Sequence, residues 1–269
     1  EGDRIDNNDA LDGSNDDSVQ AGAGNDSIFS GIGNDTIDAG TGDDTVNADA
    51  GDDVVYAGDG NDTVHAGSGN DQVFGDAGND LIFGYDGNDT ISGGDGADIM
   101  NGMTGDDLLD GGADNDTFVT EGGFGNDTVI GGEAVTSGTD YDTIQLNTVS
   151  VTAPVAVTFT ADEAGTLTTG ANTLDFSEIE RLELADNNDT VDGTVTTTGI
   201  DINAMGGDDS VLGGSGDDTV NGGTGNDTIT GGQGADSITG GTGDDVIQAA
   251  RATQSLAEMA TTPLTLPIW

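Results

Sequence analysis

The chain has 269 residues, of which 53 are acidic and only 3 are basic, and it contains one histidine and no cysteine. The formal net charge of −50 excludes binding to the phosphate backbone of nucleic acids and electrostatic attachment to an anionic membrane, because both need a basic surface. The lack of cysteine excludes disulfides and thiolate metal sites, and no apolar run approaches the ~20 residues of a membrane-spanning helix, so we expect no membrane insertion.

A nine-residue repeat organises the first part of the chain, for which we take residues 1–130 as the bounds of a first array. Twelve consecutive units fill 12–119 without a gap, and a thirteenth, GGFGNDTVI, occupies 122–130. In the twelve units the sixth position is always aspartate and the eighth is always apolar. Self-similarity at a fixed period predicts a solenoid.

A segment of different composition, 131–203, separates this array from a second one of five units at 204–248. Within the segment, β-branched and apolar residues predict strands at 143–151, 155–160 and 181–184. We therefore expect a β-rich connection that continues the solenoid. The remaining residues, 249–269, predict a C-terminal cap or tail, with a short helix followed by an extended end.

Each unit combines a turn with a short strand. Glycines at positions 2 and 4 permit a positive φ, and Asn or Asp at position 5 can bond its own backbone. Positions 7 to 9 predict a three-residue strand whose position 8 faces inward, which gives an interior of one aliphatic side chain per unit. Burying that side chain returns far less free energy than ordering nine backbone residues consumes, and the carboxylates repel one another. The repeat therefore needs a bound cation.

Calcium fits the ligands that the repeat offers. It accepts carboxylate and carbonyl oxygens in flexible geometry, whereas zinc prefers histidine and cysteine, and magnesium demands strict octahedral geometry. We expect several Ca2+ ions as the cofactor, and a chain that folds only when they bind.

The repeat resembles the GGxGxDxUx nonapeptide of the RTX (repeats-in-toxin) family, and GGTGNDTIT at 222–230 matches it at every defined position. The resemblance implies an all-β parallel β-roll, or β-helix solenoid, with two units per coil and calcium between the turns of successive coils. Asp142 and Asp189 keep the aspartate but lose the glycine turn, so the pattern supports sites there only weakly. The implied metal ligands, with neighbouring turn carbonyls, are the position-6 aspartates Asp17, Asp26, Asp35, Asp44, Asp53, Asp62, Asp71, Asp80, Asp89, Asp98, Asp107, Asp116, Asp127, Asp209, Asp218, Asp227, Asp236 and Asp245.

Two units per coil would stack aspartates that lie 18 residues apart, such as Asp17 on Asp35 and Asp26 on Asp44. The two resulting columns predict roughly ten ions in the first array and roughly three in the second.

No active site is predicted, so we expect a protein that is not an enzyme. His65 falls at position 9, an outward strand position, and a phosphate loop would need a lysine, which the chain lacks. The family resemblance implies type I secretion and folding outside the cell, where calcium is plentiful. The sequence thus favours a secreted, extracellular or cell-surface protein with a structural or adhesive role.

Two alternatives remain open. The chain could be the calcium-binding part of a larger secreted enzyme or toxin, or a module that binds polysaccharide or ice. Carbohydrate is therefore a further candidate partner, but the threonine rows at position 7 are interrupted by Val54, Gln72 and Leu108, which disfavours ice.

Exposed apolar rows predict self-association into a filament or multimer. The apolar tail LTLPIW at 264–269 adds a segment that could cover the last coil or join a neighbour's. The expected stacks are Tyr56 on Phe74, with Val54 beside Tyr56, His65 on Phe83, Leu81 on Ile99, and Tyr85 on Met103.

Overall fold

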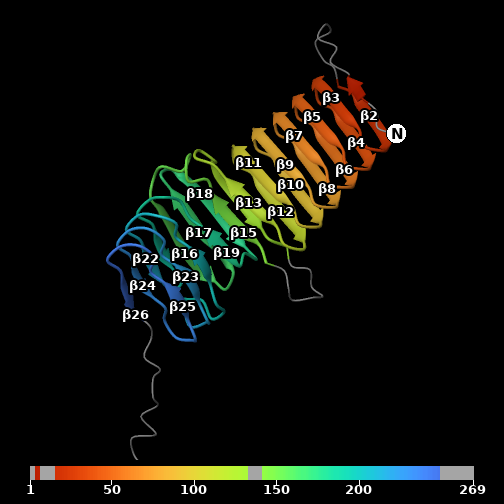
Figure 1. Cartoon of the computed structure of the whole chain (residues 1–269). Coiled ribbons are helices and arrows are strands. Elements are labelled where there is room, and N and C mark those ends of the chain that lie inside the picture. Colours follow the sequence, from red (N-terminus) through yellow and green to blue (C-terminus); the bar gives the residue numbers. More distant parts are fainter. Residues whose placement is uncertain (1–3, 7–15, 133–140, 249–269) are drawn as a thin grey trace, which may run out of the picture.

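The computed structural model describes residues 4–6, 16–132 and 141–248, which form an elongated solenoid of strands and turns without an α-helix (Figure 1). The two arrays occupy opposite ends of the solenoid, and the connecting segment lies between them. This architecture confirms the predicted parallel β-roll. Within the described part of the chain, no helix is long and apolar enough to cross a membrane.

Two sheets form the walls of the solenoid. The first sheet contains, in spatial order, β1 (Arg4–Asp6), β3 (Ser27–Ile32), β5 (Thr45–Ala50), β7 (Thr63–Ser68), β9 (Leu81–Asp86), β11 (Ile99–Thr104), β13 (Thr117–Thr120), β15 (Thr143–Leu146), β19 (Arg181–Glu183), β21 (Asp201–Asn203), β23 (Thr219–Asn221) and β25 (Ser237–Thr239). The second sheet contains β2 (Ser18–Ala23), β4 (Thr36–Thr41), β6 (Val54–Asp59), β8 (Gln72–Ala77), β10 (Thr90–Asp95), β12 (Leu108–Ala113), β14 (Asn126–Ile130), β18 (Asn172–Ser177), β17 (Ala164–Thr169), β16 (Val155–Ala161), β20 (Thr190–Asp192), β22 (Ser210–Leu212), β24 (Thr228–Thr230) and β26 (Val246–Gln248).

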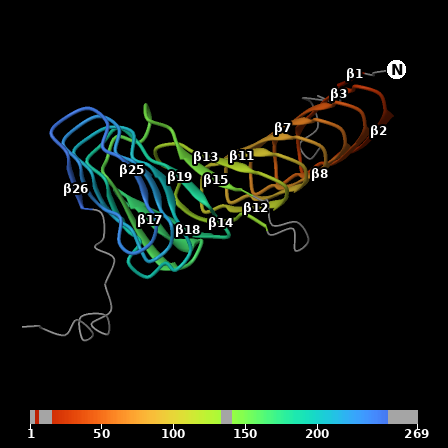
Figure 2. The same ribbon diagram turned by 60° about the horizontal axis from the view of Figure 1, so that its bottom comes forward.

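Successive units alternate between the two sheets, so one coil comprises two units and 18 residues (Figure 2). In the first sheet, for example, Val46 pairs in parallel register with Val64, and Val64 pairs with Ile82. Each of these side chains is completely buried. The eighth position of every coil therefore adds to one continuous apolar row inside the solenoid.

The strands of the first array are longer than the sequence predicted. Most span six residues, because the strand continues from position 9 through positions 1 to 3 of the next unit. Position 1 faces inward as well, and Ala39, Ala48, Ala57 and Ala66 are fully buried there. The interior thus holds two inward side chains per unit in these coils, rather than the one that was predicted, because alanine is small enough to fit beside the position-8 residue. In the second array the strands have the predicted three residues.

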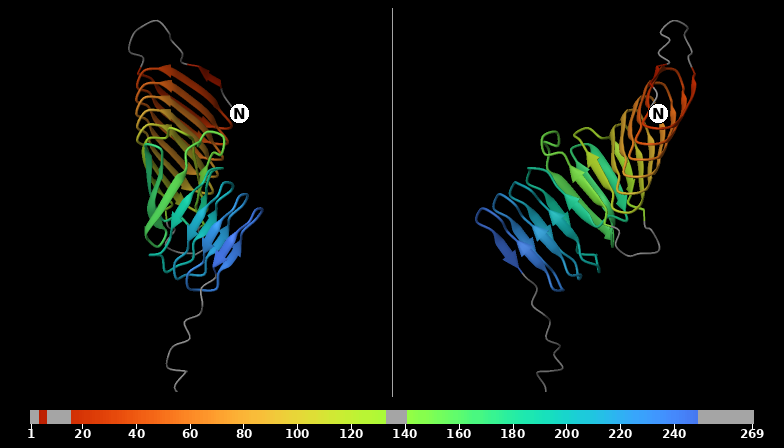
Figure 3. Two further views of the ribbon diagram at one scale, coloured as in Figure 1. Left: turned by 90° about the vertical axis from the view of Figure 1, so that its left-hand side faces the viewer. Right: turned by 45° about the vertical axis from the view of Figure 1, so that its right-hand side comes forward.

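The connecting segment differs from both arrays (Figure 3). Strands β16, β17 and β18 form an antiparallel meander that is inserted into the second sheet, and Phe159 packs edge-on against Phe176 with ring centroids 5.5 Å apart. The strand predicted at 143–151 ends at Leu146, because a turn follows. The C-terminal helix and extended tail predicted for 249–269 lie outside the described residues.

Candidate metal centres

The position-6 aspartates precede the strands and form two columns, one along each sheet. The column of the first sheet contains Asp26, Asp44, Asp62, Asp80, Asp98, Asp116 and Asp142, and later Asp218 and Asp236. The column of the second sheet contains Asp17, Asp35, Asp53, Asp71, Asp89, Asp107 and Asp127, and later Asp189, Asp209, Asp227 and Asp245. Asp17, Asp236 and Asp245 are partly exposed, whereas the other aspartates of the columns are buried.

One carboxylate oxygen fixes each side chain to the preceding coil. The backbone N–H of Asp71 donates to Oδ1 of Asp89 at 2.9 Å, and the N–H of Asp89 donates to Oδ1 of Asp107 at 2.9 Å. Because the same bond recurs along both columns, the carboxylates are held in position before any ion binds. Asp89 is only 2% exposed as a result.

The other carboxylate oxygen is buried without a hydrogen-bond partner in most of the columns. This holds for Oδ2 of Asp35, Asp44, Asp53, Asp62, Asp71, Asp80, Asp89, Asp98, Asp107, Asp189, Asp209 and Asp227. A buried charged oxygen without a partner is strongly destabilising unless a cation lies next to it. Residues 16–132 supply no lysine or arginine, since the chain contains no lysine and its three arginines lie at positions 4, 181 and 251.

Burial changes the acidity of these groups accordingly. Loss of hydration, reinforced by the neighbouring carboxylates of the column, raises the pKa of Asp53, Asp80 and Asp89 to about 7. The same two causes raise the pKa of Asp127 to about 8. A site that disfavours a negative charge this strongly, yet carries a carboxylate in every turn, is complementary to a cation.

Backbone carbonyls converge on the same space. A β-carbon placed on Gly84 would lie 2.3 Å from Oδ2 of Asp89 and 2.8 Å from the carbonyl oxygen of Gly102 in the next coil. At Gly93 the corresponding distances, to Oδ2 of Asp98 and the carbonyl oxygen of Gly111, are 2.2 and 2.6 Å. Glycine therefore leaves room in which a carboxylate oxygen and a carbonyl oxygen meet.

The donor set fits calcium. Among the described residues, no three His, Cys, Asp or Glu side chains lie close enough to hold a metal by themselves. An ion between two coils would therefore take its remaining ligands from carbonyl oxygens, which calcium accepts readily in flexible geometry. These turns offer no histidine or thiolate for zinc.

A second polar ladder, along position 5, was not predicted. The backbone N–H of Asn70 donates to Oδ1 of Asp52 at 2.8 Å, and the N–H of Asn88 donates to Oδ1 of Asn70 at 3.0 Å. The prediction that position 5 bonds its own backbone was wrong, because the side chain instead reaches the following coil. The 18-residue recurrence of Asn or Asp was the signal that could have revealed this ladder.

Asp142 and Asp189 join the columns, although the sequence pattern supported them only weakly. They are 2% and 1% exposed. Oδ1 of Asp142 accepts from the N–H of Asp116 at 2.7 Å, and the N–H of Asp189 donates to Oδ1 of Asp209 at 2.8 Å. A preceding glycine turn is therefore not required to place the carboxylate.

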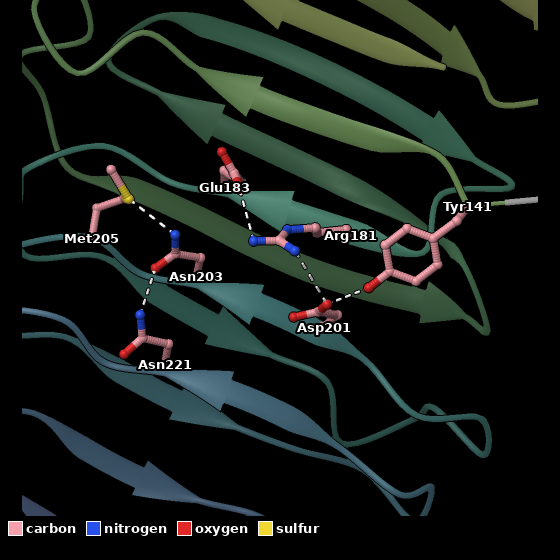
Figure 4. A network of polar contacts seen from close by, with 7 residues as sticks. All are labelled: Tyr141, Arg181, Glu183, Asp201, Asn203, Met205 and Asn221. Atoms are coloured by element: carbon pink, nitrogen blue, oxygen red, sulfur yellow. Dashed lines mark hydrogen bonds and ion pairs between the residues drawn. The ribbon is translucent and has the colours of Figure 1, made fainter. Parts of the chain in front are cut away.

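The column of the first sheet is interrupted in the connecting segment, where Glu180 and Ile200 precede β19 and β21. Arg181 lies at this interruption (Figure 4). Its Nη2 lies 2.8 Å from Oε1 of Glu183, and its Nη1 lies 3.7 Å from Oδ2 of Asp201. The Tyr141 hydroxyl also donates to Asp201. Burial, together with this carboxylate, raises the pKa of Tyr141 to about 12. Here the chain neutralises its own carboxylates with a guanidinium group.

Comparison with known proteins identifies the family of the chain. No curated protein matches the chain. A crystal structure of a hyperactive, Ca2+-dependent, β-helical antifreeze protein from an Antarctic bacterium is similar at 20% identity and a TM-score of 0.30, over 91% of this chain and 83% of that one. The family model of the RTX calcium-binding nonapeptide repeat matches residues 11–46, 38–73, 65–100, 92–124, 120–134, 201–229 and 212–247, which together exceed half of the sequence. The chain therefore belongs to the RTX calcium-binding repeat family and is a calcium-binding β-roll.

Proposed function

We propose that this protein is a calcium-dependent structural rod that is secreted and folds outside the cell. The observation that carries the proposal is the row of buried Oδ2 oxygens without a partner in each sheet. Without calcium these carboxylates must be either protonated or buried as unpaired charges, and both states oppose folding near neutral pH. A fold that requires calcium suits an extracellular rather than a calcium-poor environment.

The ions would lie between successive coils, held by the position-6 aspartates and the neighbouring carbonyls. Columns that begin at Asp17 and Asp26 and continue to Asp127 and Asp142 contain one more gap each than the sequence alone indicated. We expect about twelve ions in this part of the solenoid if each gap holds one ion. The rod would have no catalytic role, since the aspartates of the columns are committed to the repeat.

The test is calcium removal. The chelated protein should lose most of its β signal in circular dichroism at neutral pH, and calcium should restore it, whereas magnesium at the same concentration should not. Metal analysis of the refolded protein should give about a dozen or more calcium ions per chain. A chelated protein with an unchanged spectrum and melting temperature would rule the proposal out.

Self-association is the second part of the proposal. Two of the predicted stacks are present: the ring centroids of Tyr56 and Phe74 lie 5.1 Å apart with an interplanar angle of 8°, and those of His65 and Phe83 lie 5.3 Å apart with an angle of 5°. At the C-terminal end of the described solenoid, Ile247 is 46% exposed, although Ile229 in the same row is fully buried.

An apolar row that opens at the end of a coil favours addition of a second copy of the chain. Light scattering of the calcium-loaded protein should show species larger than the monomer, and Ile247→Ser should reduce them. A strictly monomeric protein at high concentration would refute self-association and leave the calcium proposal intact.

A further inference from the structure

Position 2 of the repeat departs from glycine mainly on one sheet. This position has a positive φ, which favours glycine. In the first array, the first sheet carries Asp49, Tyr85 and Met103 there, at φ values of 79°, 78° and 70°, whereas the second sheet carries only Asp76, at 69°. Side chains in this backbone region cost free energy, and such strain is concentrated at functional sites. The first sheet therefore carries most of this strain in the first array, which makes its outer face a candidate functional surface.

Two of these residues line an open hollow on the surface. Asp49, Gly67 and Tyr85 are register neighbours on β5, β7 and β9. Gly67, between Asp49 and Tyr85, carries no side chain. The three residues line a hollow of about 510 Å3, which is within the size range of small-molecule sites. Its other lining side chains are Asn47, His65, Ser68 and Asp86.

Tyr85 is held across this hollow. Its hydroxyl lies 3.0 Å from Nδ1 of His65 in the preceding coil, and its ring is tilted by 44° to the imidazole and by 47° to Phe83. Tyr56 on the second sheet behaves differently, since its ring stacks face to face on Phe74. Tyr85 therefore does not extend an aromatic ladder, and the residue remains 37% exposed beside the hollow.

The chemistry of the lining selects the ligand. One aromatic ring is surrounded by two carboxylates, an amide, a hydroxyl and an imidazole, a combination that suits a ring with one apolar face and several hydroxyl groups. No lysine or arginine lines the hollow, and the chain carries a net charge of −50, so an anionic ligand would be repelled.

We propose that the hollow between Asp49 and Tyr85 binds an uncharged saccharide. The carboxylates and Asn47 would accept and donate hydrogen bonds to sugar hydroxyls, and the Tyr85 ring would pack against the C–H face of the sugar. This inference goes beyond the proposed calcium-dependent rod, because none of the six side chains belongs to the aspartate columns.

His65 is the only histidine of the chain, so its imidazole proton resonances report on this hollow alone. The calcium-loaded full chain is titrated with cellotetraose, maltotetraose and tetra-N-acetylchitotetraose, while these resonances are followed by NMR. At least one saccharide should shift them in a saturable manner. If none of the three shifts them at millimolar concentration, the proposal is wrong, and the calcium-loaded circular dichroism spectrum separates this failure from a failure to fold.

Two matched variants separate a binding role from a structural one. Tyr85→Gly restores the residue that the positive φ favours, so the melting temperature should stay the same or rise while the affinity falls by tenfold or more. Asp76→Gly makes the equivalent change on the opposite sheet and should leave the affinity unchanged. Wild-type affinity in Tyr85→Gly, or equally tight binding of tetragalacturonate, which is anionic, would overturn the proposal.

Discussion

Replacing Asp89 by asparagine should change stability in opposite directions with and without calcium. The pKa of Asp89 is raised from 3.8 to about 7, so keeping this carboxylate charged in the ion-free fold costs on the order of 4 kcal/mol above pH 8. Asparagine retains an oxygen that can accept from the N–H of Asp71, but it carries no charge. The ion-free variant should therefore be more stable than the wild type by up to that amount.

In calcium the sign should reverse. The substitution removes a charged ligand from a buried ion site, and breaking one half of a buried ionic interaction destabilises by ~3–5 kcal/mol. Hydrogen-exchange mass spectrometry of the amides in β10 and β12 measures the loss locally in calcium. In chelator, the gain is measured as β signal in circular dichroism that Asp89→Asn retains and the wild type loses. Asp59→Asn, on an exposed residue, makes the same charge change outside the columns and serves as the control. If Asp89→Asn and Asp59→Asn shifted exchange equally in calcium, Asp89 would not be a ligand.

Three further predictions concern pH, the arginine and the position-5 ladder. Because the folded pKa of Asp80 (about 7) lies above its unfolded value, protonation stabilises the ion-free fold at low pH, and that stability is lost as pH rises through 7. The chelated protein should therefore show more β signal in circular dichroism at pH 5 than at pH 8. The opposite trend would contradict the burial argument. Arg181→Met leaves the carboxylates of Glu183 and Asp201 without their cation and should destabilise the calcium-loaded protein by ~1–3 kcal/mol in thermal unfolding. Arg181→Lys should recover part of that loss. An unchanged melting temperature for both variants would show that the two ion pairs of Arg181 are dispensable. Asn70→Ala removes the acceptor of the Asn88 N–H, so it should lower the free energy of unfolding by ~1 kcal/mol and speed hydrogen exchange of the Asn88 amide. Asn70→Asp keeps the acceptor and should not speed that exchange.

The sequence predicted the parts of the fold that depend on the repeat period. The 18-residue spacing predicted which aspartates stack, and the alternation around position 8 predicted the inward row from Val19 to Ile229. The strand length was underestimated because small residues at position 1, such as Ala48, also face inward. The residue type alone does not distinguish an inward-facing strand alanine from an alanine in a turn.

The features that the sequence did not predict depend on contacts between coils. The hydrogen bond from Asn70 to Asp52 joins residues in different coils, and no local motif encodes it. Asp142 and Asp189 have Asp140 and Asn187 in place of the position-4 glycine, so only the register of β15 and β20 with their neighbours reveals that they belong to the columns. The contact of the tilted Tyr85 ring with His65 likewise joins residues in different coils.

The hydrogen-bond ladders at positions 5 and 6 join residues one coil apart. The length of an array can therefore change only by whole coils. Deleting 18 residues such as 90–107 would bring each donor opposite an equivalent acceptor and would leave the hollow at Tyr85 intact. Deleting nine residues such as 72–80 would transfer every later strand to the opposite wall, so that Tyr85 would no longer share a sheet with His65. The repeat thus sets the length of the arrays in whole coils. Shorter and longer forms of the rod are accessible by gain or loss of 18 residues, and register partners in neighbouring coils of an array lie two units apart.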